Sequence, residues 1–111
     1  MTEEQIALAR RAVACRGWRW IPGMKVIDSV RMTEGMLKFT HPSDLPDLTD
    51  PATLGCLLAL VREAHGCSEA HVYYATVSRL WVARWGRNGL GQWTVDAHTE
   101  AEAIVAALEA A

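Results

Sequence analysis

The sequence has no long apolar run and few cysteines. No segment approaches the roughly 20 apolar residues that a membrane-spanning helix needs. The first residues, MTEEQIALARRAV, carry acidic side chains in place of the apolar segment of a secretory signal. Three cysteines are an odd number, which is typical of reduced thiols rather than of a disulfide framework. We therefore expect a cytoplasmic protein without a membrane anchor.

Motifs of the common catalytic chemistries are also missing. The chain has no glycine-rich phosphate loop, no G-x-S-x-G and no H-E-x-x-H. Ser, His and Asp are all present, but no spacing places a nucleophile beside a base. The sequence therefore predicts a protein that is not an enzyme.

Potential metal ligands occur, although not at the spacing of a known motif. His65, Cys67 and His71 are zinc-type donors with Cys56 nearby in sequence, but they form neither C-x-x-C nor H-x3-H. A histidine near the end of a helix and small buried thiols explain these residues more simply. We expect no metal and no other cofactor.

The aspartates at 44, 47 and 50 are spaced like the start of a calcium loop. Pro46 interrupts them, and the glycine and final glutamate of such a loop are missing. We expect these aspartates to form turns and to cap a helix.

Basic charge is sparse and uneven. Residues 1–40 carry a net charge of +3 and residues 41–111 a net charge of −5. Nucleic-acid binding proteins usually carry a clustered basic face, and this one has only a modest group of five cations. A nucleic-acid partner is therefore not expected. The five cations are Arg10, Arg11, Arg16, Arg19 and Lys25.

With 111 residues, half of them hydrophobic, the chain has the size and composition of a single domain over 1–111. Three helices are predicted from their start signals, and the first two end at Gly17 and Gly66. The start signals are Thr2 with Gln5, Asp50 with Pro51, and Thr99 with Glu102.

Segments rich in β-branched and aromatic residues predict strands between these helices. Two of them should pair as a hairpin around 33–35, and the proline-rich segment 42–51 should be a loop. The predicted fold is α+β, with three helices packed on a mainly antiparallel sheet of four to five strands, an α/β sandwich. The extended segments are 18–21, 24–32, 36–41, 71–77, 80–86 and 92–95.

Five tryptophans are the most unusual feature of the composition. A two-residue turn at Asn88-Gly89 would place Trp85 opposite Gln92 and Arg84 opposite Trp93. The aliphatic side of the sheet, which carries Leu80, Val82, Arg84, Trp93 and Val95, should then face the helices. The other side becomes a candidate binding face, unless the first helix covers it and the indoles are core. Its residues are Trp18, Arg19, Trp20, Trp81, Trp85 and Gln92.

Three segments also resemble small proteins of tailed bacteriophages and prophages, including the phage ABA sandwich group. They are RGWRWIPGM, LPDLTDPATLGCLLALVREAHG and HTEAEAIVAALEAA. The resemblance implies helices flanking a sheet and a viral protein in a bacterial cytoplasm. It transfers no catalytic residue.

The leading expectation is a non-enzymatic phage accessory protein that acts by binding, as an inhibitor of a host defence protein. The alternative is a small-molecule binder that sequesters a nucleotide-like signal, with Trp and Arg stacking on the base. A structural or regulatory phage protein is a third expectation. The sequence leaves open whether the chain forms a homo-oligomer.

Overall fold

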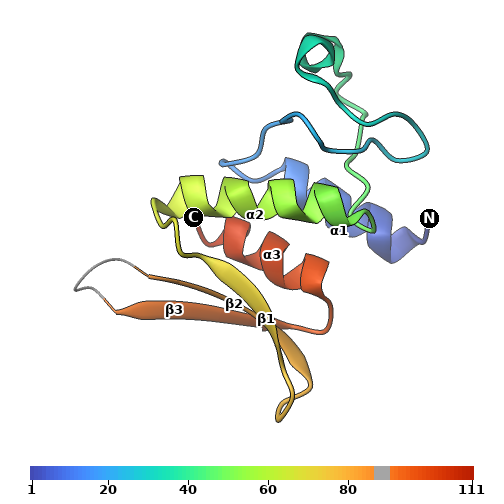
Figure 1. Ribbon diagram of the computed structural model, residues 1–111. Coiled ribbons are helices and arrows are strands. Elements are labelled where there is room, and N and C mark those ends of the chain that lie inside the picture. Colours follow the sequence, from blue (N-terminus) through green and yellow to red (C-terminus); the bar gives the residue numbers. More distant parts are fainter. Residues whose placement is uncertain (87–90) are drawn as a thin grey trace.

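The computed structural model describes residues 1–86 and 91–111, and three layers are visible in it (Figure 1). None of the described helices is long and apolar enough to span a membrane. In chain order, the elements are α1 (Glu3–Val13), the 3-10 helix η1 (Glu34–Phe39), α2 (Pro51–His65), β1 (His71–Ala75), β2 (Leu80–Gly86), β3 (Gln92–Ala97) and α3 (Glu100–Glu109).

Helix α3 forms the middle layer of the molecule. It contacts all three strands on one side and both α1 and α2 on the other. Five of its ten residues are at most 1% exposed: Ala103, Ile104, Val105, Ala107 and Leu108. Burying a Val, Leu or Ile side chain stabilises a fold by about 1.5–3 kcal/mol, so α3 is the main apolar contact between sheet and helices.

The sheet has three antiparallel strands in the order β1-β2-β3. The predicted α+β class agrees with this architecture, but the prediction of four to five strands and three helices is wrong, because the sheet has three strands and the described residues also form the 3-10 helix η1. No described residue before 71 belongs to a strand of the sheet. Helix α3 covers one face of the sheet, and no described helix covers the other (Figure 1).

The predicted pairing of β2 and β3 is wrong by one residue. Trp85 lies opposite Trp93, and Arg84 opposite Thr94. A one-residue slip moves every side chain of a strand to the other face, so Trp93 shares the side of Trp85. The predicted Asn88-Gly89 turn lies outside the described residues.

The predicted strands 18–21, 24–32 and 36–41 do not form. Residues 14–50, which connect α1 to α2, instead make a long excursion over α2 (Figure 1). The chain turns inside 24–32, at Asp28, whose φ of 54° is tolerated by Asp better than by most residues. Only two isolated bridges form, Lys25 with Arg31 and Val26 with Pro46. The segment predicted as the second strand of the hairpin winds into η1 instead.

Local capping signals predicted the helix starts correctly. Thr2 and Gln5 form both hydrogen bonds of a capping box, and Thr99 Oγ1 accepts from the Glu102 amide. Gly66 ends α2 in the left-handed conformation, as expected. Helix α1, however, ends at Val13 rather than at Gly17. A Cβ at Gly17 would lie 3.0 Å from that of Ala64 in α2, so this glycine allows a close approach of two segments.

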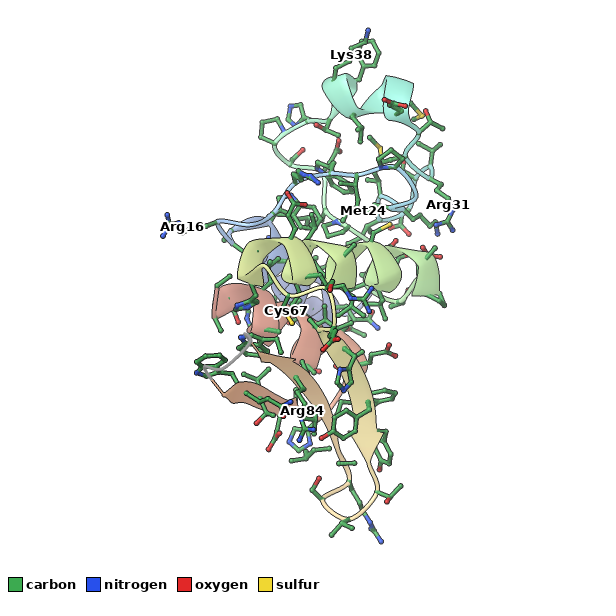
Figure 2. The ribbon with its side chains drawn as sticks, turned by 60° about the vertical axis from the view of Figure 1, so that its left-hand side comes forward. Arg16, Met24, Arg31, Lys38, Cys67 and Arg84 are labelled. Carbon is green, nitrogen blue, oxygen red and sulfur yellow. The ribbon has the colours of Figure 1, made fainter. Side chains whose placement is uncertain are left out.

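Asp50 attaches the excursion to the start of α2. Its carboxylate accepts from the Thr53 amide at 3.0 Å and from both terminal nitrogens of Arg31 at 2.8 and 3.0 Å. Thr53 Oγ1, fully buried, accepts from the Lys25 amide at 2.9 Å. Met24 is buried between the excursion and α2 (Figure 2). Asp50 is therefore a capping residue, as the sequence predicted.

The pKa of Asp50 is lowered, first by the hydrogen bonds from Arg31 and then by those from Thr53. A lowered folded-state pKa stabilises the fold above the unfolded pKa of about 3.9, and this contribution is lost as the pH falls. We expect the free energy of unfolding to fall less steeply below pH 4 in Asp50→Asn, which retains a capping residue. Urea melts at pH 7, 4 and 3 measure this slope, and equal slopes in both proteins would contradict it.

Candidate functional site

Three residues of the predicted binding face, Trp18, Arg19 and Trp20, lie beside α2. Trp18 and Trp20 meet edge to face, with ring centroids 5.3 Å apart. Both are half-buried against the core. Arg19 forms an ion pair with Glu63 of α2 at 2.7 Å. This part of the predicted face serves contacts within the helical layers.

The tryptophans of β2 point toward the helices, opposite to the predicted orientation. Trp85 is 8% exposed and stacks on His65 of α2, with ring centroids 4.5 Å apart. Trp81 contacts Tyr74 edge to face at the other end of the strand. The sequence analysis left open that the first helix covers these tryptophans. The helix that packs on β2 is α3 instead. The four indoles therefore form no single face.

Among the described residues, a concave site lies where the sheet meets the end of α2. It is a cleft of about 500 Å³, open to solvent, and it brings together Trp85 and Gln92 of the predicted face. Figure 2 shows Arg84 on the sheet and Cys67 near the junction of helices and sheet. The described lining comprises Gly66, Cys67, Ser68, Glu69, His71, Arg84, Trp85, Gly86, Gly91 and Gln92.

The residues that come directly after α2 form one wall of the cleft. Gly66, in the left-handed conformation, turns the chain toward the sheet, and the Cys67 amide donates to the Arg62 carbonyl at 2.9 Å. Arg62 Nε donates to the carbonyl of Ala70 at 2.8 Å. These bonds fix both ends of the short connection, so Ser68 and Glu69 are held over the cleft.

His71 and Tyr73 extend the site along β1. The two rings stack with centroids 5.7 Å apart. His71 Nδ1 lies 2.9 Å from the carbonyl oxygen of Glu69. Because a carbonyl oxygen only accepts hydrogen bonds, this contact assigns the ring proton to Nδ1 and leaves Nε2 as the acceptor in the neutral ring.

Arg84 is the cation of the cleft. It lies on the central strand, directly opposite His71 on one side and Thr94 on the other, on the face away from α3. Its guanidinium carbon is 5.9 Å from the Tyr73 ring centroid, within reach of a cation–π contact. Its Nε is buried and has no hydrogen-bond partner among the described residues. An unmatched buried donor costs about 1–3 kcal/mol.

The residues that the sequence offers as potential zinc ligands make other contacts. His65 Nε2 lies 2.7 Å from the Ala107 carbonyl oxygen, and His71 contacts Glu69. Within residues 1–86 and 91–111, no three metal-ligating side chains come together. Burial raises the pKa of the Cys15 and Cys56 thiols, which makes them less reactive.

Asp44, Asp47 and Asp50 form turns and cap α2, as the sequence analysis predicted. Asp44 accepts from the His41 amide at 2.8 Å. Burial raises the pKa of Asp47, but hydrogen bonds from Thr49 and Lys25 outweigh it, so the pKa is lowered overall.

Sequence reasoning missed most of the cleft. Arg84 was placed on the side facing the helices, while Ser68 and Glu69 had no assigned role. One signal was present: Arg84 is a lone charge inside the otherwise apolar stretch LWVARW. A charge in such a strand indicates an uncovered face or a ligand.

Comparison of the chain with protein-family models, curated proteins and solved structures found no match. No enzyme family is therefore identified for it. The resemblance to phage proteins is untested by these comparisons and stays a proposal.

Trp85 is expected to be a core residue. Replacing it with Ala should lower the free energy of unfolding by about 3–5 kcal/mol. Trp93, directly opposite on β3 and 45% exposed, is the matched control, and Trp93→Ala should cost about 1 kcal/mol. Denaturant melts of both variants measure the difference. Equal losses would mean that Trp85 is not part of the core.

Proposed function

We propose that this protein is a non-enzymatic binding protein whose ligand is a small molecule held in the cleft beside β2. The single observation that carries the proposal is the cleft of about 500 Å³ with polar groups from three separate segments. Ligand sites in proteins are commonly concave, have volumes of about 300–1,000 Å³ and contain a few converging polar groups. A nucleotide-like molecule is of this size.

The resemblance to phage proteins gives this proposal a biological context. A phage accessory protein that sequesters a small signal molecule needs a binding site and no catalytic group. The cleft provides a hydroxyl, an amide, an imidazole and a guanidinium, from Ser68, Gln92, His71 and Arg84. These groups can orient a polar ligand.

Blocking the cleft tests the proposal. Ser68 is exposed and lines the cleft, so Ser68→Trp should fill it at little cost in stability. Ser78 is exposed in the turn between β1 and β2, and Ser78→Trp is the matched control. A thermal-shift screen with nucleotides and small metabolites measures ligand-induced stabilisation, about 2.7 kcal/mol at 100 times Kd.

We expect the wild type and Ser78→Trp to be stabilised by the same ligand and Ser68→Trp to show no such shift. If Ser68→Trp keeps the full shift, the ligand binds elsewhere. If no compound stabilises the wild type, the proposed function fails.

A second proposal is the phage accessory protein that inhibits a host protein. The observation that favours it is the sheet face opposite α3, which no described helix covers. This face carries Tyr73, which is 37% exposed, beside Arg84. Tyrosine and arginine are enriched at protein–protein interfaces.

A pull-down from host lysate with matched variants tests the second proposal. Tyr73→Ala should lose a partner protein that the wild type captures. Val77→Ala, at the fully exposed tip of the same hairpin, should retain it. Equal capture by both variants would exclude this face as the docking surface.

A further inference from the structure

We propose that the cleft recognises its ligand through an oxyanion, a carboxylate or a phosphate, bound by the guanidinium of Arg84. The proposal rests on the proposed function and specifies the chemistry of that site. It identifies a specificity-determining residue, because the anion would separate the ligand from neutral molecules of the same size.

The position of Arg84 is fixed by its surroundings. It lies in the middle strand with paired neighbours on both sides, and Tyr73 lies beneath its guanidinium. A guanidinium held in this way has lost much of the freedom that a surface arginine keeps. It is therefore prepared to form the two parallel hydrogen bonds that a carboxylate or phosphate accepts from arginine.

The charge of Arg84 is not neutralised within the described part of the protein. Several arginines and lysines of the described residues form no ion pair, and Arg84 is the one of these that lines the cleft. Its buried Nε has no described partner. Buried polar groups in proteins are nearly always hydrogen-bonded, so an unmatched donor in a cleft calls for an explanation. An anion from outside the chain supplies the missing negative charge.

The other groups of the cleft define the ligand further. Ser68 and Gln92 offer neutral hydrogen-bond donors beside Arg84, and the Nε2 of His71 accepts in the neutral ring. Together they suit a ligand that carries hydroxyl groups beside its anion. The carboxylate of Glu69 also lines the cleft. It repels an anion, so it should lower the affinity.

Four probes separate the possible ligands: adenosine monophosphate, adenosine, inorganic phosphate and succinate. Thermal shift and calorimetry measure their binding to the full chain. The proposal expects adenosine monophosphate to bind at least tenfold more tightly than adenosine. Binding of inorganic phosphate assigns the anion to a phosphate, and binding of succinate assigns it to a carboxylate. Equal binding of adenosine and its monophosphate, or no binding by any anionic probe, would overturn the proposal.

Variants locate the anion. Arg84→Gln should weaken binding of the anionic probe by about 10- to 100-fold, the effect of losing hydrogen bonds to a charged group. Arg79→Gln is the matched control, because it makes the same charge change in the exposed turn at the other end of β2. It should leave the affinity unchanged. Glu69→Gln should strengthen binding, since it removes a repelling charge.

Stability distinguishes a ligand-binding arginine from a structural one. Without ligand, Arg84→Gln should melt close to the temperature of the wild type, because the glutamine amide takes the position of the Arg84 Nε, where the wild type has no described hydrogen bond to lose. A clear loss of stability would make Arg84 a structural residue. If Arg84→Gln binds normally while Ser68→Trp does not, the cleft is the site and the oxyanion proposal is wrong. If Ser68→Trp also binds normally, the proposed function fails with it.

Discussion

The burial of α3 between two layers is the constraint on which the rest of the structure depends. A helix packed on both sides needs small side chains where its neighbours come close, and four of the ten residues of α3 are alanines, of which Ala103 and Ala107 are fully buried. Its larger residues, Ile104 and Leu108, are almost fully buried. Helix α3 packs on one face of the sheet, and no described helix covers the opposite face.

Local chemistry predicted the helices well, because a cap is a contact between residues that are close in sequence. Thr2, Asp50 and Thr99 each cap the helix that the sequence predicted. Strands depend on distant partners, and propensity alone cannot supply them. The segment 24–32 has the composition of a strand, yet Asp28 turns it back on itself and no neighbouring strand pairs with it.

The cleft was harder to predict than the fold. Its side chains come from the loop after α2, from β1 and from both ends of the β2–β3 connection, and only the strand register places them together. The pairing error of one residue placed Val95 of β3 on the same side as Leu80 and Val82 of β2, which made that side the more aliphatic one. Arg84 was therefore predicted to face the helices and Trp85 to lie on the uncovered side. The six predicted face residues share an unusual composition, but only Trp85 and Gln92 share the cleft.

The place of α3 in the chain also determines when the protein can fold during its synthesis. Every surface that packs on α3 belongs to an element that precedes it. The apolar sides of α1, α2 and the sheet therefore lack their α3 contacts until the residues after 100 have left the ribosome. Exposed apolar surface and unpaired strand edges favour aggregation during this interval. In this fold, the interval ends only when α3 has been synthesised and packs between the two layers.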